Sequence, residues 1–459
     1  MKKRIVILGA GVSGLTTAYW LSKENYEITI LEKKDVVGGS MESVLLNGML
    51  FDRGPNSGLE TTPLVQQLIE ELHLKDKFQY GTKKGNKRYI LRDGKLHALP
   101  MSPGALVKTK LYSTKGKLRL LAEPFIGRSK DGYYQSIAQF VQRRLGREFL
   151  DYTINPFVAG VYAGKPEELS VKSAFPKLYA LEENYGGLIV GTVRSIRERK
   201  KRKEIAKQSA KMFSFTEGMQ ALPLAIYKKM KDNIILNAAA TSVRKEGNGY
   251  LVNYTENGER KSIFADAMLS TIQAFELSEV MRDYDGILSN RLNSIYHPPV
   301  MVLFLAYKVA DIPVPLDGFG FLIPAIENSS FLGALWNSVI FEDRTPPDTA
   351  SFTLFVGGSR NADIFTSPIE EIIPKVISEF NEIMKIKTKP DVVEHRFWLK
   401  SIPQYNVGYI EHENYFDKFE ELNKGFFLSG NFRGGISVGD CIKNSEIVCE
   451  KVKEYLNEN

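Results

Sequence analysis

An apolar run followed at once by a glycine-rich loop constrains the fold of this chain more than any other feature. Residues 5–8 read IVIL, the composition of a buried strand, and lead directly into Gly9, Ala10, Gly11, Val12, Ser13 and Gly14. Residues 15–23 have helical spacing, and a second apolar strand at 27–31 ends in Glu32. In such a unit the glycines let backbone approach a pyrophosphate, the helix N-terminus supplies N–H donors, and the acid can bind a ribose. The pattern predicts a dinucleotide site.

Two other interpretations of an apolar N-terminal segment are disfavoured. Lys2, Lys3 and Arg4 before the apolar run resemble the charged start of a secretory signal, but three glycines among residues 9–14 make a poor signal helix. The longest uncharged apolar run, 300–307, has the length of a core strand rather than of a membrane span. We therefore expect neither a signal nor a transmembrane helix.

Composition is that of a globular protein with an ample core. The 459 residues are 43% hydrophobic and 25% charged, and this length predicts two or three domains. Cys441 and Cys449 are too few for a disulfide framework, which favours a reduced, cytoplasmic setting. The five histidines lack ligand spacing, so no metal site is expected.

The net charge of +7 is concentrated in two basic stretches, 194–211 and 108–121, the second of them interleaved with apolar residues. A solvated helix or loop and contact with an anionic membrane surface both fit these stretches. Nucleic acid is disfavoured, because no recognition motif accompanies the charge.

Two further glycine-rich segments favour FAD over a nicotinamide cofactor. The first comprises residues 37–40 (VGGS) and 51–57 (FDRGPNS), which follow the second strand. The second is the turn at 430–440 (GNFRGGISVGD), which leads into a C-terminal helix whose N-terminus suits the pyrimidine edge of an isoalloxazine. An extended FAD needs a second backbone segment along its pyrophosphate. No second GxGxxG occurs in the sequence, so an NAD(P)H module is not supported.

Four segments resemble the protoporphyrinogen oxidase family, which includes the coproporphyrinogen III oxidases. They are residues 86–90 (NKRYI), 155–164 (NPFVAGVYAG), 355–360 (FVGGSR) and 430–435 (GNFRGG), and the resemblance extends over the whole chain. The chain departs from the pattern at Ser40, where a basic residue is usual, and at Glu217, where a glycine is usual.

The resemblance implies FAD-dependent, oxygen-consuming six-electron oxidation of a porphyrinogen in haem biosynthesis, of protoporphyrinogen IX or alternatively of coproporphyrinogen III. Arg88 would pair with a substrate propionate, Leu322, Leu335 and Phe355 would hold a pyrrole ring, and Gly160 would place a carbonyl beside it. Besides the first loop and Glu32, the implied FAD contacts are Lys33, Gly39, Ser40, Gly54, Pro55, Asn56, Ser57, Val243, Trp398, Gly430, Asn431, Ile436, Ser437 and Val438. Surface strand, core and turn roles remain open for these residues.

The expected fold is α/β, a Rossmann-like FAD-binding domain interleaved with a mixed-sheet substrate domain and a helical membrane-associating insertion. The FAD-binding domain is predicted at 1–80, 206–271 and 391–459, the substrate-binding domain at 81–96 and 272–390, and the helical domain at 97–205. Peripheral membrane association in the cytoplasm follows, with ferrochelatase and a second copy of the chain as candidate partners.

Three alternative functions share parts of this pattern. A flavin amine oxidase or a carotenoid desaturase would use the same cofactor domain. A haem-pathway binding protein would keep the motifs without turnover, and a nicotinamide dehydrogenase would lack visible flavin absorbance. Porphyrinogen oxidation needs placement and exclusion of water more than acid–base side chains, which fits a chain without a histidine or carboxylate constellation.

Overall fold

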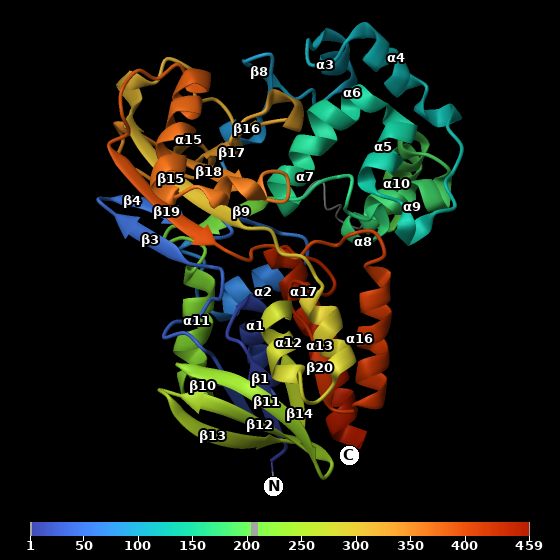
Figure 1. Ribbon diagram of the computed structural model, residues 1–459, viewed down its shortest axis with the longest axis vertical. Helices are drawn as coiled ribbons and strands as arrows, with labels where there is room; N and C mark the ends of the chain where they lie inside the picture. Colours follow the sequence, from blue (N-terminus) through green and yellow to red (C-terminus); the bar gives the residue numbers. More distant parts are fainter. Residues whose placement is uncertain (1, 203–209, 459) are drawn as a thin grey trace.

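The computed structural model describes residues 2–202 and 210–458 (Figure 1). Residues 203–209 of the basic stretch predicted at 194–211 lie outside the described residues. Both termini lie at the lower end of Figure 1, beside a parallel five-stranded sheet. Its strand order is β10 (Ile234–Ile235), β2 (Glu27–Leu31), β1 (Arg4–Leu8), β14 (Ala267–Ser270) and β20 (Phe426–Leu428).

Helices cover both faces of this sheet, because its strands are apolar on both sides. One core joins it to α1 (Val12–Leu21), α2 (Leu64–Glu71), α11 (Ala221–Met230) and α17 (Val438–Glu458). The other core joins it to α12 (Ala274–Met281), α13 (Gly286–Asn293), α16 (Ile410–Leu422) and an antiparallel meander. That meander consists of β11 (Ala238–Glu246), β12 (Gly249–Glu256) and β13 (Glu259–Ala265), with Gly247 and Gly258 in its two hairpin turns.

A mixed seven-stranded sheet forms the upper left of Figure 1. Its order is β19 (Val392–Trp398), β15 (Val300–Lys308), β18 (Thr349–Gly357), β17 (Phe331–Trp336), β16 (Gly320–Leu322), β7 (Arg88–Arg92) and β8 (Lys95–Ala98). One face packs on α15 (Ile369–Met384), whose Ile372, Val376, Phe380 and Met384 are buried at helical spacing. Short ribbons connect the two large sheets: β3 (Ser43–Leu46) with β4 (Met49–Asp52), and β5 (Gly58–Leu59), β9 (Met212–Phe215) and β6 (Phe78–Tyr80).

The helical segment at the upper right of Figure 1 lies between β8 and β9 in the chain. It comprises α3 (Pro103–Lys108), α4 (Thr114–Leu121), α5 (Ile137–Leu145), α6 (Arg147–Phe149), α7 (Asn155–Tyr162), α8 (Val171–Ala174), α9 (Pro176–Tyr185) and α10 (Leu188–Arg202). Among the described residues, we find no helix that combines the length and the apolar character needed to cross a bilayer.

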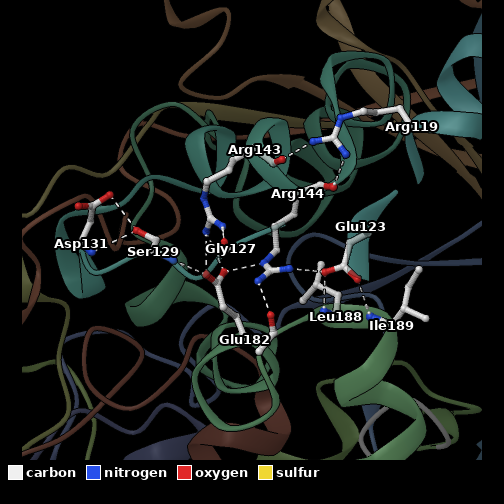
Figure 2. Close-up of polar contacts among 11 residues, drawn as sticks. Arg119, Glu123, Gly127, Ser129, Asp131, Arg143, Arg144, Glu182, Leu188 and Ile189 are labelled. Atoms are coloured by element: carbon white, nitrogen blue, oxygen red, sulfur yellow. Dashed lines mark hydrogen bonds and ion pairs between the residues drawn. The ribbon is translucent and has the colours of Figure 1, made fainter. Parts of the chain in front are cut away.

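A buried ionic network holds this helical segment together (Figure 2). The Arg144 guanidinium, fully buried on α5, donates to Glu182 on α9 at 2.8 Å and to the buried Glu123. Glu123 in turn accepts the backbone N–H groups of Leu188 and Ile189 at 2.7 and 3.0 Å, which caps the first turn of α10. Both carboxylate oxygens of Glu123 and all three guanidinium nitrogens of Arg144 make hydrogen bonds. The network therefore fixes α5, α9 and α10 relative to one another.

The predicted fold class is confirmed, while the predicted segment limits, among them 272 and 391, stay predictions. Helices α12 and α13 pack on the dinucleotide side, since their apolar residues complete the core under the meander. Strand β19 pairs with the buried strand β15, so residues 392–398 belong to the seven-stranded sheet. The chain therefore changes sheets near Asn293 and Trp398.

Candidate cofactor and substrate site

The first glycine loop has the geometry that a pyrophosphate requires. Gly9 has a φ of +95°, a conformation that favours glycine, and donates its N–H to the Leu31 carbonyl at 2.8 Å. A Cβ at Gly14 would lie 2.0 Å from the Gly9 oxygen, so only glycine lets the helix approach the strand this closely. At Gly11, by contrast, no atom of the protein lies within 4 Å of where a Cβ would stand. The loop thus leaves open backbone at the N-terminus of α1.

Glu32 is held beside this loop at the end of β2. Its carboxylate is buried and accepts the N–H of Ala10 at 2.8 Å through one oxygen and that of Lys34 at 2.9 Å through the other. Each oxygen keeps a lone pair for a further donor such as a ribose hydroxyl. The neighbouring Lys33 points elsewhere and pairs with Glu276 of α12.

The second glycine segment lies directly against the first. Gly38 donates its N–H to the Ala10 carbonyl at 2.9 Å, and a Cβ at Gly39 would lie 3.3 Å from the Cα of Gly11. Although Ser40 brings no charge, the Lys34 ammonium donates to the Gly39 carbonyl at 3.1 Å and supplies a cation nearby. The two segments therefore present backbone and positive charge to one place.

The loop of Gly54, Pro55, Asn56 and Ser57 connects this place to the seven-stranded sheet. Gly54 packs so closely on Ser40 that a Cβ would meet its carbonyl at 1.8 Å. The Asn56 amide donates to Asn337 at 3.1 Å, and the Asn337 amide donates to Thr353 on β18 at 2.8 Å. At the other edge, the Trp398 indole donates to the Arg53 carbonyl at 2.8 Å. Three buried or half-buried polar contacts thus fix the loop to the sheet.

The C-terminal turn completes the predicted cofactor residues. Ser437 caps α17 by accepting the Asp440 N–H at 3.1 Å, so Ile436, Ser437 and Val438 stand at a helix N-terminus. α17 packs on α1 through a 2.6 Å hydrogen bond between Ser445 and Thr16, which brings the two helix starts to one side. Gly430 and Asn431 begin this turn, two and three residues after the last residue of β20. Val243 is buried within β11 opposite Val252.

The predicted substrate residues share one face of the seven-stranded sheet. Leu335 pairs with Gly320, which pairs with Arg88, and Leu322 pairs with Gly333, which pairs with Phe355. Since paired residues point to the same side and side chains alternate along a strand, all four lie on one face, opposite to α15. Trp398 reaches the same face through Val300. Gly160 on α7 lies against this face, because its Cβ would meet Leu322 at 2.8 Å.

Arg88 is a cation without a protein anion. Among the described residues, no carboxylate pairs with its guanidinium, which lies 5.4 Å from the Phe319 ring centre. Arg88 as a whole residue is exposed, yet partial burial of its guanidinium lowers the pKa of Arg88. On the same face, Leu322, Leu335 and Phe355 lie one, two and three strands away from β7 and are only half-buried. A partly desolvated arginine beside apolar walls suits a carboxylated, largely apolar ligand.

Several residues that hold the site together were not predicted from the sequence. Tyr405 and Tyr409 donate to the carbonyls of Asn431 and Phe432 at 2.7 and 2.5 Å. Buried Arg344 donates to Asp52 at 2.9 Å and so connects β4 to the seven-stranded sheet. The glycine-rich segment at 51–57 identified the region of Asp52 in the sequence. Its partner Arg344 lies 292 residues further along the chain, and no local pattern identifies that partner.

Comparison with known proteins identifies the family. A model described as flavin containing amine oxidoreductase matches residues 12–453. The chain belongs to this family. It is 34% identical to protoporphyrinogen oxidase 2, chloroplastic/mitochondrial, of Arabidopsis thaliana, over 99% of this chain and 94% of that one. It is 25% identical to the coproporphyrinogen III oxidase of Bacillus subtilis strain 168, over 99% of each chain.

A solved structure shows the same fold. The chain superposes on a provisionally assigned protoporphyrinogen oxidase of Exiguobacterium sp. 255-15 with a TM-score of 0.82, at 20% identity, covering 100% of this chain and 99% of that one. The full-length sequence similarities confirm the predicted resemblance to protoporphyrinogen and coproporphyrinogen III oxidases. Membership of a flavin family confirms the predictions of an oxidoreductase and of FAD.

The residues present fit FAD. The open backbone at Gly11 would accommodate the pyrophosphate of FAD, and the acceptor oxygens of Glu32 would bind its ribose. The capped N-terminus of α17 would lie at the edge of its ring system. Within the described residues, no group of three His, Cys, Asp or Glu side chains is arranged to hold a metal ion.

Proposed function

We propose that this protein oxidises a porphyrinogen to the corresponding porphyrin, with FAD as cofactor and oxygen as electron acceptor, in haem biosynthesis. The observation that carries this proposal is Arg88, a partly desolvated cation on the half-buried face formed by Leu322, Leu335 and Phe355. A porphyrinogen offers the matching chemistry, propionate carboxylates on a macrocycle with apolar rings. Full-length similarity to two porphyrinogen oxidases supports the same substrate class.

Each part of the site has a task in this reaction. Arg88 would bind a propionate and so fix one edge of the macrocycle, and the three apolar side chains would hold a pyrrole ring in place. The close contact between Gly160 and Leu322 would let the backbone of α7 approach the ring from the other side. Bound FAD would accept two electrons at a time, so three cycles of flavin reduction and reoxidation by oxygen account for the six electrons removed from the porphyrinogen. The protein's contribution is placement and exclusion of water.

Protoporphyrinogen IX is the preferred substrate in this proposal, with coproporphyrinogen III as the alternative. The higher identity to the Arabidopsis thaliana enzyme than to the Bacillus subtilis enzyme, 34% against 25%, favours it. Both substrates carry two propionates that Arg88 could bind. Coproporphyrinogen III carries two more in place of vinyl groups, and these need further cations or solvent.

Parallel turnover tests the function and its alternatives. Purified holoenzyme is incubated in air with each porphyrinogen, and porphyrin fluorescence and hydrogen peroxide are followed against an enzyme-free control. We expect fluorescence to rise fastest with protoporphyrinogen IX, with three peroxide molecules per porphyrin. If the flavin stays oxidised when either porphyrinogen is added without oxygen, the protein binds its ligand without turnover. If amines or polyenes reduce the flavin instead, the protein is a flavin amine oxidase or a carotenoid desaturase.

The helical segment would place this enzyme on an anionic membrane surface. An apolar surface lies on α3, α4 and the turn after α4. Each of its side chains is exposed by 63% or more, and they are Val107, Leu118, Leu121 and Phe125. Lys108, Lys110 and Lys115 are exposed beside them. Leu111, Tyr112 and Leu120 of the same basic stretch are instead buried, and Arg119 donates to backbone carbonyls of α5. The proposed membrane contact therefore involves fewer residues of the stretch 108–121 than the sequence predicted. The proposed partners ferrochelatase and a second copy of the chain stay predictions.

A further inference from the structure

A pair of stacked tyrosines lies beneath the turn that we assign to the flavin. Tyr405 and Tyr409 are each 2% exposed, and their ring centres are 4.4 Å apart at 24° between planes. The Tyr405 hydroxyl donates to the Asn431 carbonyl at 2.7 Å and accepts the Gly435 N–H at 3.1 Å. One hydroxyl therefore bridges the two ends of the turn 431–435.

Both hydroxyl groups are protonated at neutral pH. Burial raises the pKa of Tyr405 and of Tyr409 well above the ordinary value of tyrosine. They can therefore act as donors to the turn carbonyls at neutral pH. Loss of a hydroxyl would leave buried backbone groups without a partner.

The same segment is attached on its other side to the part of the chain that carries Gly160. The Tyr405 carbonyl accepts the N–H of Ser170 at 2.9 Å, just before α8. The Gln404 amide donates to the carbonyl of Tyr162, the last residue of α7, at 2.8 Å. Residues 404–409 thus connect α7, on the substrate side, with the turn on the cofactor side.

We propose that Tyr405 is a positioning residue for the flavin: its hydroxyl sets the backbone of the turn 431–435 and, through it, the affinity for FAD and the reduction potential of the bound cofactor. This inference rests on the proposed placement of the flavin at Gly430, Asn431 and residues 436–438. The turn leads into the N-terminus of α17, whose positive end stabilises negative charge that develops on reduction. A displaced turn would weaken that stabilisation.

Tyr405→Phe tests the proposal, because it removes the hydroxyl and keeps the stacked ring. Apoprotein is titrated with FAD and the flavin fluorescence gives Kd, while dye-coupled reduction of the holoenzyme gives the midpoint potential. We expect Kd to rise about 5- to 100-fold and the potential to become more negative. Tyr409→Phe removes a single hydrogen bond to the turn and should shift both quantities in the same direction by less.

Tyr307→Phe is the matched control. Tyr307 is 1% exposed on β15 and donates to Asn381 at 2.6 Å, so the substitution removes an equally buried hydroxyl far from the turn. It should lower stability and leave the FAD Kd and the potential unchanged. The proposal is overturned if Tyr405→Phe stays within twofold of the wild type in Kd with an unchanged potential, or if Tyr307→Phe shifts both equally.

Gly11→Val separates this inference from the site assignment on which it rests. A valine there fills the open space beside the first loop, so FAD binding should be lost. If Gly11→Val keeps stoichiometric flavin, the cofactor placement itself is wrong. If Gly11→Val loses flavin while Tyr405→Phe behaves as the wild type, the placement stands and only the role of Tyr405 is refuted.

Discussion

Arg88 is the residue whose replacement should separate substrate binding from cofactor binding. Arg88→Ala removes a charge-assisted hydrogen bond to a propionate, worth about 1.5–3 kcal/mol, and kcat/KM should fall about 10- to 150-fold. Arg88→Lys should restore only part, because an ammonium cannot make the bidentate contact. Steady-state turnover of a porphyrinogen measures both variants, and flavin content should equal that of the wild type.

An exposed arginine outside the site controls this experiment. Arg260 lies on β13, on the dinucleotide side of the molecule, and Arg260→Ala should leave kcat/KM unchanged. If Arg88→Ala oxidises carboxylated porphyrinogens as fast as the wild type, Arg88 is a surface strand residue and the proposed substrate orientation is wrong.

His297 should make the protein sensitive to mild acid. Burial, together with the nearby Lys400 and against the hydrogen bond to the Ile295 carbonyl, lowers the pKa of His297 from 6.5 to about 4. The folded protein therefore binds fewer protons than the unfolded chain between these pH values, so the free energy of unfolding falls as pH drops from about 6.5 to 4. The total loss is about 3 kcal/mol. Urea unfolding at several pH values measures it.

His297→Asn provides the matching variant, since an amide can still donate to the Ile295 carbonyl that the Nδ1 of His297 contacts at 2.8 Å. The pH dependence in that window should become shallower by this amount. His395→Asn, at an exposed histidine, should leave the slope as in the wild type. Parallel curves for His297→Asn and wild type would show that His297 does not cause the sensitivity.

At the scale of elements, the network around Arg144 should determine the stability of the helical segment. Arg144→Met leaves Glu123 buried without its cation and Glu182 with Arg143 alone, which should lower the free energy of unfolding by about 3–5 kcal/mol. In the wild type, hydrogen bonds from Arg144 and Arg143 hold the pKa of Glu182 below its ordinary value, although burial alone would raise it. Thermal and urea unfolding followed by circular dichroism measure the loss.

Arg147→Met serves as its comparison, because Arg147 forms an exposed pair with Asp151 one helical turn away. Such pairs contribute about 0.3–0.5 kcal/mol, so this variant should unfold close to the wild type. Equal stability of the two variants would mean that the buried network makes no net contribution.

Local patterns predicted most elements, and the reason is visible in particular segments. The strand at 5–8, the strand at 27–31 and the helix after the first glycine loop were found because apolar spacing and length suffice to define them. The network of Glu123, Arg144 and Glu182 was not found, since a charged residue in a helix looks solvent-exposed until its partners are known. Asn56 was predicted to contact the cofactor. Its hydrogen bond to Asn337 was not predicted, for the same reason.

At the scale of the whole molecule, the two sheets bring the predicted cofactor loops to the predicted substrate face. The contacts of Asn56, Trp398 and Arg344 join segments up to 345 residues apart. The resemblance supplied the identity of the residues on both sides, and the strand register places four of them on one face. Neither composition nor spacing could have supplied that register.

The helical segment lies at the end of the molecule opposite to the chain termini (Figure 1), so an enzyme bound through it would keep the dinucleotide side in water. Replacing Leu118, Leu121 and Phe125 together by Ser should abolish sedimentation with anionic vesicles, because each side chain is at least 63% exposed and nothing in the fold depends on it. Leu422→Ser, at a leucine that is 74% exposed on α16, should bind as the wild type does.

Charge contributes a separate part of the same membrane contact. Neutralising Lys108, Lys110 and Lys115 as glutamines should weaken binding to anionic vesicles by roughly 100-fold, at about 1 kcal/mol for each lysine near the surface. Wild-type binding should fall with added salt, whereas the triple glutamine variant should respond less, because salt screens only the charges that remain. Equal sedimentation of the wild type with neutral and anionic vesicles would refute the electrostatic part. Unchanged sedimentation of the Ser variant would refute the apolar part, so each contribution has its own decisive outcome.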